Sequence, residues 1–160
     1  MATVTMGKFT FYNGFLKGVG DGAATTKYDL AAAGGVKCMV VTSTYTPDLD
    51  NHSNKTSVTG EAAASNGYSA GGFACTTPTW TKSGTGTSAV YNFDHDDIAI
   101  ANVTGAGITG KYLVWYIVSS GQLIGYALMN STGADVNFPA AASGNSITVP
   151  TSGWFGQGQQ

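Results

Sequence analysis

Residues 112–129 constrain the fold of this chain most strongly, because they hold two apolar runs joined by a short polar turn. The runs are KYLVWYIV and QLIGYALM, with Ser119-Ser120-Gly121 between them. The pattern predicts a β-hairpin, and because side chains alternate along a strand, both of its faces are apolar. An antiparallel pair with one face in water would be polar at every second position. The second face must therefore be covered, either by a second sheet with a long loop or by another protein subunit.

The rest of the chain predicts an all-β fold. Short β-branched and aromatic runs separated by Gly, Asn and Ser are typical of strands, and they occur at 3–12, 36–44, 73–82, 87–93, 98–103, 136–138 and 146–149. Asn13-Gly14 and the glycine-rich residues 18–22 end the first strand, and residues 15–19 are expected to form at most a helical turn. We predict one domain over residues 1–160, a single-domain antiparallel β-sandwich that is jelly-roll-like, with long loops; a Greek-key sandwich of another order is the alternative.

Two segments stand apart from this pattern of strands. Residues 45–72 are polar, which predicts an extended loop. Loops of that length are uncommon in compact domains and usually have a function, and docking along a neighbouring protein is one such function. Residues 153–160 set Trp154 and Phe155 among Gly and Gln, which predicts a flexible or docking C-terminal arm.

Charge and hydropathy exclude several classes of partner. Only 10% of the 160 residues are charged, arginine is absent and the net charge is −2, so the clustered basic residues of a nucleic-acid-binding protein are missing. No stretch approaches the roughly 18–20 apolar residues that span a bilayer, and residues 1–14 lack the apolar core of a signal peptide. We expect no nucleic acid partner, no membrane partner, and synthesis in the cytoplasm.

The candidates for catalytic or metal chemistry are few. Asp94, His95, Asp96 and Asp97 are adjacent but lack the spacing of a calcium loop, so turn formation is favoured over weak calcium binding. A set of Ser53, His52 and Asp50 is disfavoured as a hydrolase triad because adjacent residues rarely converge on one reacting atom. Cys38 and Cys75 read as buried thiols. We therefore predict a protein that is not an enzyme, with no cofactor and no bound metal.

Aromatic side chains offer a further possibility, a sugar-binding face. Aromatics within strands are more often core or interface than ligand platforms. Only Trp80, in TPTWTKS, has the polar neighbours that an exposed stacking ring would need.

Three segments together resemble a known group of proteins. They are Tyr45-Thr-Pro-Asp with His52 following, Gly67-Tyr-Ser-Ala-Gly-Gly, and FDHDDIAIAN leading into the hairpin. In that order they resemble small structural proteins of tailed bacteriophages, which include the decoration or cement proteins of phage heads. The resemblance covers roughly residues 45–128 and does not extend to the glycine-broken segment 9–30.

The resemblance implies a non-enzymatic virion component with a jelly-roll-like sandwich, located on the capsid exterior and assembling as a dimer or trimer. Its partners would be the major capsid protein and further copies of itself. The alternative is a tail, baseplate or head-fibre protein with a glycan-binding role. From the apolar hairpin and the C-terminal arm, the predicted subunit or capsid contacts are Trp115, Tyr116, Tyr126, Trp154 and Phe155.

Overall fold

A computed structural model describes residues 2–4, 6, 8–20, 28–148 and 155–158. Its elements are β1 (Thr3–Val4), β2 (Phe9–Phe11), α1 (Asn13–Gly20), β3 (Val36–Val41), η1 (Lys55–Ser57), β4 (Phe73–Ala74), β5 (Thr79–Ser83), η2 (Gly86–Ser88), β6 (Val90–Asp94), β7 (Ile98–Ile100), β8 (Ile108–Gly110), β9 (Tyr112–Ile117), β10 (Leu123–Leu128), β11 (Val136–Phe138), β12 (Asn145–Ile147) and β13 (Phe155–Gly158). The fold is all-β and sandwich-like, as the sequence predicts.

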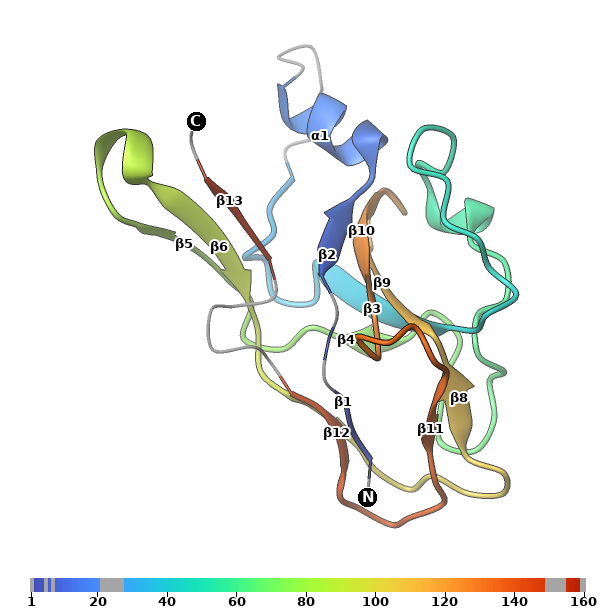
Figure 1. Cartoon of the computed structure of the whole chain (residues 1–160). Coiled ribbons are helices and arrows are strands. Elements are labelled where there is room, and N and C mark those ends of the chain that lie inside the picture. Colours follow the sequence, from blue (N-terminus) through green and yellow to red (C-terminus); the bar gives the residue numbers. More distant parts are fainter. Residues whose placement is uncertain (1, 5, 7, 21–27, 149–154, 159–160) are drawn as a thin grey trace.

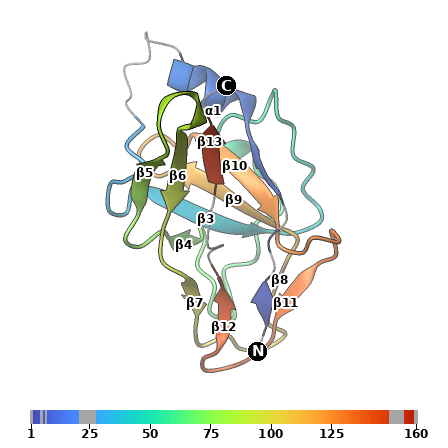
Figure 2. The same cartoon turned by 60° about the vertical axis from the view of Figure 1, so that its left-hand side comes forward.

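The central layer is a five-stranded antiparallel sheet in the order β2-β10-β9-β3-β4 (Figure 1). The predicted hairpin is confirmed as β9 and β10, and β9 lies at the centre because β3 pairs with its other side. Beside this sheet stands a ribbon in the order β13-β6-β5. The short strands form two further small sheets, β1-β12-β7 and β11-β8. Both lie at the bottom of the view in Figure 2, near the N-terminus of the chain.

The main core fills the space between the central sheet and the smaller sheets. From the central sheet it takes the odd-numbered residues of β9, Leu113, Trp115 and Ile117, all buried. From the opposite side it takes Phe93 of β6 and Phe138 of β11. The odd-numbered face of β9, which carries Trp115, therefore turns inward.

The other face of the hairpin is covered by the chain itself. Val114 and Tyr116 of β9 belong to a second cluster that includes Tyr45, and Leu49 and Val58 pack against it. The long loop that the sequence predicts is thus the cover, and it is fastened by the isolated bridges Val41 to Glu61 and Asn54 to Gln122. The sequence leaves two possibilities for this cover, another part of the chain or another subunit. In the structure, the chain itself supplies it.

Several details differ from the sequence-based expectation. Strand β1 pairs with β12 in parallel, and the expected strand 73–82 is interrupted between β4 and β5. Residues 13–20 form a helix of two turns rather than a single turn. Strand β8 was not predicted, and it pairs with β11. The alternation in β10 is broken because Leu123 pairs with Tyr116 whereas Gly125 pairs with Trp115, which makes a β-bulge at Ile124. The bulge turns Ile124 into the main core, on the same side as Ala127.

The C-terminal arm is only partly described. Phe155–Gly158 form β13, which runs antiparallel to β6 with Phe155 opposite Phe93. The positions of Gly153 and Trp154 lie outside the described residues.

Candidate functional site

The predicted contact residues of the hairpin are mostly covered within the chain. Trp115 is 0% exposed and Tyr116 is 2% exposed, so neither presents a surface to a partner, and the expectation that they form a subunit contact is wrong for this fold. Tyr126 is half-buried and packs against Tyr12 and Tyr112. Of the predicted arm contacts, Trp154 lies outside the described residues, as does the side chain of Phe155.

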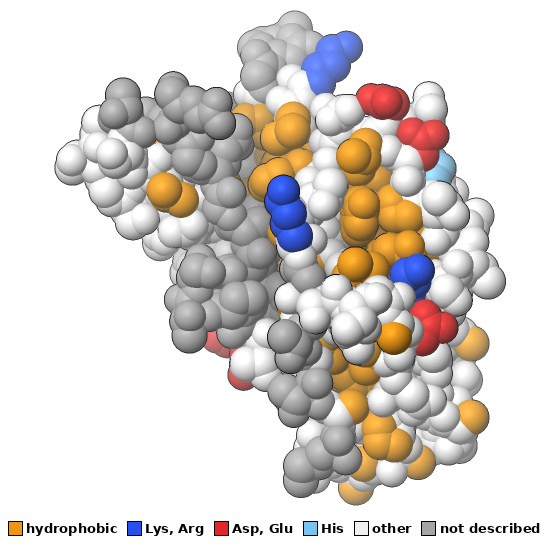
Figure 3. Space-filling view, viewed as in Figure 1, with side chains coloured by type: hydrophobic (Ala, Val, Ile, Leu, Met, Phe, Trp, Pro, Cys, Tyr) orange, Lys and Arg blue, Asp and Glu red, His pale blue; other side chains and the backbone are white. Residues whose placement is uncertain are grey.

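Tyr126 belongs to the more open face of the central sheet. Figure 3 shows apolar side chains along the region of β2 and β10, and on this face Tyr126 and Leu128 of β10 are half-buried. Tyr126 is thus the one described residue among the predicted contacts that retains exposed surface.

His52 anchors the start of the long loop through a chain of hydrogen bonds. Its Nδ1 lies 3.2 Å from the backbone N of Asp48 and 2.9 Å from Oη of Tyr45. Because a backbone N–H can only donate, Nδ1 is the unprotonated nitrogen and the Tyr45 hydroxyl also donates to it. The Tyr12 hydroxyl, 2.7 Å from that of Tyr45, then donates in turn. Burial raises the pKa of both tyrosines, so the chain of donors stays protonated.

This arrangement leaves no room for the disfavoured hydrolase triad. The carboxylate of Asp50 accepts a hydrogen bond from Nδ2 of Asn13 at 2.6 Å. The Nδ1 atom that a triad carboxylate would orient is already occupied by Tyr45 and Asp48. His52 therefore acts as a loop anchor.

Glu61, the only glutamate of the chain, fastens the second half of the loop. Its Oε1 accepts hydrogen bonds from the Tyr68 hydroxyl at 2.8 Å and from the backbone N–H of Gly71 at 2.6 Å. Tyr68 Oη accepts from the backbone N–H of Val40 in β3, and the Tyr116 hydroxyl donates to the carbonyl of Gly71. The carboxylate thus holds residues 61–71 together, while the Tyr68 hydroxyl and the Gly71 carbonyl tie this segment to β3 and β9.

His95 is buried, at 3% exposed, between β6 and the main core. Its Nδ1 lies 2.8 Å from the carbonyl oxygen of Asp96, so Nδ1 carries the proton. Nε2 is then the acceptor for the indole N–H of Trp115, 3.5 Å away. Burial lowers the pKa of His95, although Asp94, Asp96 and Asp97 oppose the shift. The ring is held neutral and serves as a support for Trp115.

The aspartates around His95 act as turn-forming groups. Asp94 Oδ1 accepts from the backbone N–H of His95, and the Asp96 carboxylate accepts from the Thr77 hydroxyl. Within the described part of the chain, no three His, Cys, Asp or Glu side chains are placed to hold a metal ion.

Both cysteines are buried thiols, as the sequence predicts. Burial raises the pKa of the Cys75 thiol to about 12 and that of Cys38 well above its usual range. Thiols that stay protonated are poor nucleophiles and metal ligands, so neither is suited to chemistry.

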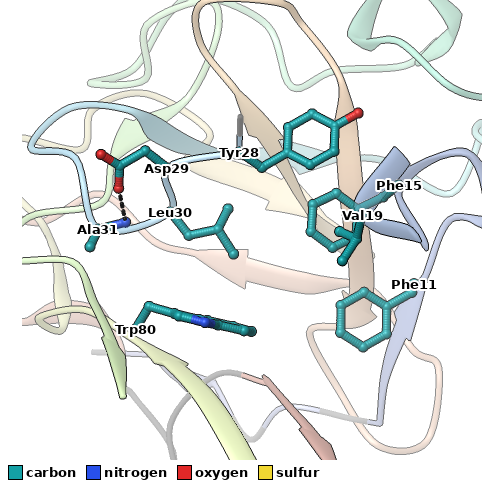
Figure 4. A pocket seen from close by; sticks show the side chains of 8 residues that line it. All are labelled: Phe11, Phe15, Val19, Tyr28, Asp29, Leu30, Ala31 and Trp80. Atoms are coloured by element: carbon teal, nitrogen blue, oxygen red, sulfur yellow. Dashed lines mark hydrogen bonds between the residues drawn. The ribbon is translucent and has the colours of Figure 1, made fainter. Parts of the chain in front are cut away.

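The remaining candidate is an apolar cavity beside α1. It has a volume of about 340 Å³ and is lined by Phe11, Phe15, Val19, Tyr28, Asp29, Leu30, Ala31 and Trp80 (Figure 4). The Trp80 ring is 40% exposed and forms one wall, stacked on Tyr91 with 6.1 Å between ring centroids. Sequence reasoning singled out Trp80 by its polar neighbours, but it missed Val19, which is 57% exposed, because the helix itself was not expected.

Comparisons with known proteins add no relative. No family model, no curated protein and no solved structure matches the chain. Among the described residues, no helix combines the length and the apolar character needed to cross a bilayer.

Proposed function

We propose that this protein is a non-enzymatic virion structural protein, a capsid decoration protein that binds the outside of a phage head and stabilises it. Its partners would be the major capsid protein and further copies of itself. The proposal starts from the resemblance of residues 45–128 to small virion proteins of tailed bacteriophages.

One observation carries the proposal: the residues that make up the resemblance form hydrogen bonds that hold the long loop and the core in place. Tyr45 and His52 anchor the start of the long loop, Tyr68 and Gly71 bind the carboxylate that closes it, and His95 supports Trp115. Proteins that share a fold would need the same anchoring residues, so a resemblance made of such residues supports a fold in common with the small virion proteins. It supports a role in contact rather than catalysis, since these groups are engaged in holding the fold.

The surface chemistry agrees with that role. With 10% charged residues and no arginine, contacts to a partner would be made through hydroxyl, amide and apolar groups. Such contacts are individually weak, but many copies arranged on a symmetric shell gain strength from effective concentration. A decoration protein is present in many copies on such a shell.

The experiment that tests the proposal is a measurement of location and copy number in particles made by the genome that encodes this chain. We expect copies on the shell in the hundreds, and particles that lack the protein should lose infectivity faster on heating or osmotic shock. Adding the purified protein back to such particles should restore resistance. Particles without copies on the shell, with unchanged resistance after deletion of the gene, would contradict the proposal.

A second candidate is a tail, baseplate or head-fibre protein that binds host glycans. The exposed ring of Trp80 on β5 favours it, because an exposed flat ring suits a pyranose face. Copy number separates the two: a handful or a few dozen per particle would indicate the tail. Binding to a glycan array that is lost in Trp80→Ala and kept in Thr81→Ala would support this candidate.

A further inference from the structure

Strand β5 is the open edge of the ribbon. The strand order β13-β6-β5 ends there, and all five residues Thr79–Ser83 are exposed. Figure 2 shows β5 on the outer side of β6. The pairing of β5 with β6 is regular over its whole length, from Thr79 opposite Asp94 to Ser83 opposite Val90, with no bulge. A regular edge strand whose second side pairs with no other described strand presents backbone donors and acceptors to another chain.

The sequence of β5 is complementary to itself in one antiparallel register. If two copies of TWTKS pair about a two-fold axis at Thr81, each Trp80 lies opposite Lys82 of the other copy. Residues two apart lie on the same face of a strand, so the two Trp80 and Lys82 pairs share a face, where a cation can lie over an aromatic ring. This register also keeps the two Lys82 side chains from lying directly opposite each other.

The cavity beside Trp80 matches the incoming lysine in charge. Asp29 is the only charged residue among the described residues that line it, and it is exposed. Figure 4 shows Asp29 and Leu30 on the same side of the Trp80 ring. A lysine brought to Trp80 from a second copy would therefore meet an aromatic wall, with one carboxylate nearby, that of Asp29, which also accepts a hydrogen bond from the backbone N–H of Ala31.

We propose that the occupant of the β5 edge is a second copy of this chain, paired antiparallel through β5 about a two-fold axis at Thr81. The two ribbons then form one continuous sheet, and the contact is isologous, as in most two-fold dimers. This inference rests on the proposed function, which includes binding to further copies of the chain, and it specifies where two copies meet. The inference is tested on the isolated protein and the proposed function on particles, so either one can fail while the other holds.

Disulfide trapping gives the direct test. Residues opposite each other in an antiparallel pair have Cβ atoms about 4.5–5.5 Å apart, close to the separation that a disulfide needs. In Thr81→Cys the two new thiols would face each other, so mild oxidation with oxidised glutathione should yield a covalent dimer. In the matched control Thr79→Cys the two thiols would be about 13 Å apart along the strands, and no dimer should form. Cys38 and Cys75 are 0% and 1% exposed and do not compete.

Second-site changes test the pairing itself. In the Thr81→Cys background, Trp80→Ala or Lys82→Glu should slow cross-linking about tenfold, since each removes two symmetric pairs. Labelling of the same thiol by a small disulfide reagent should stay unchanged, which separates loss of pairing from loss of exposure. Equal dimer yields from Thr81→Cys and Thr79→Cys, or no dimer from either at millimolar protein concentration, would overturn the proposal.

Discussion

At the scale of single residues, the two histidines show how fixed donors and acceptors decide whether the ring nitrogen Nδ1 donates or accepts a hydrogen bond. A carbonyl oxygen at His95 Nδ1 and a backbone N–H at His52 Nδ1 assign opposite tautomers to the two rings. In both cases the second partner is a large aromatic side chain, Trp115 or Tyr45. Each imidazole thus links backbone to an aromatic group of the core.

Replacing His52 should destabilise the fold through the hydroxyl that it leaves behind. In His52→Ala the Tyr45 hydroxyl, on a residue 2% exposed, loses its acceptor, and the free energy of unfolding should fall by about 1–3 kcal/mol. His52→Asn places an amide oxygen near the position of Nδ1 and should recover part of the loss. Urea denaturation of both variants checks the prediction, and equal losses would show that the acceptor is not what matters.

His95 should make stability depend on pH. Burial lowers its folded pKa, whereas the unfolded chain has the ordinary value of about 6.5. The unfolded state therefore binds more protons as the pH falls below 6.5, so stability is full above that pH and declines as it falls toward the folded pKa. A protonated Nε2 would also point a second donor at the Trp115 N–H.

The test is the urea midpoint between pH 7.5 and pH 5 for the native protein and for His95→Gln. Because His52 is present in both, the difference between the two curves isolates His95. The glutamine variant should start from a lower midpoint and lose less of it as the pH falls. Parallel curves would contradict the assignment.

At the scale of elements, the hairpin shows what a sequence pattern can predict and where it stops. Alternation correctly predicts that both faces of β9 are buried, because a regular strand places Trp115 and Tyr116 on opposite sides. It does not predict the face of Ile124, because a bulge inserts a residue that the apolar pattern QLIGYALM does not reveal. Nor does it predict the cover, since the aromatic and carboxylate anchors of residues 45–72 act only once the loop has folded back.

Gly125 is the position at which the bulge and the edge strand β2 meet. A Cβ there would run into the ring of Phe9 and the carbonyl oxygen of Thr10, so Gly125→Ala should push β2 away from β10. Overpacking of this kind costs about 1–3 kcal/mol. The same change should cost less in a Phe9→Ala background, because the ring has then been removed. Strictly additive losses in a double-mutant cycle would show that the ring is not the obstacle.

At the scale of the whole molecule, the chain covers its own hairpin, so folding of the hairpin does not depend on a second subunit. The second cluster is closed by Tyr45, Leu49 and Val58 from the long loop, and the Lys55 ammonium lies 5.2 Å from the centre of the Tyr116 ring. A partner is therefore not needed to bury the apolar strands. Among the described residues, exposed surface remains at the edge strand β5 and, in part, at Tyr126 and Leu128 of β10.

The order in which the two cysteines become reactive should report how this single domain opens. Cys38 lies in β3 between β9 and β4, whereas Cys75 directly follows the two-residue edge strand β4 and donates its backbone N–H to Val36. Short edge elements open locally at lower free energy than central strands. We therefore expect a thiol reagent to label Cys75 before Cys38 in low urea, and neither at a measurable rate in native buffer, where burial raises both pKa values. Cys38→Ala and Cys75→Ala assign the two phases. Labelling of Cys38 first would mean that the central sheet opens from β3 rather than from its β4 edge.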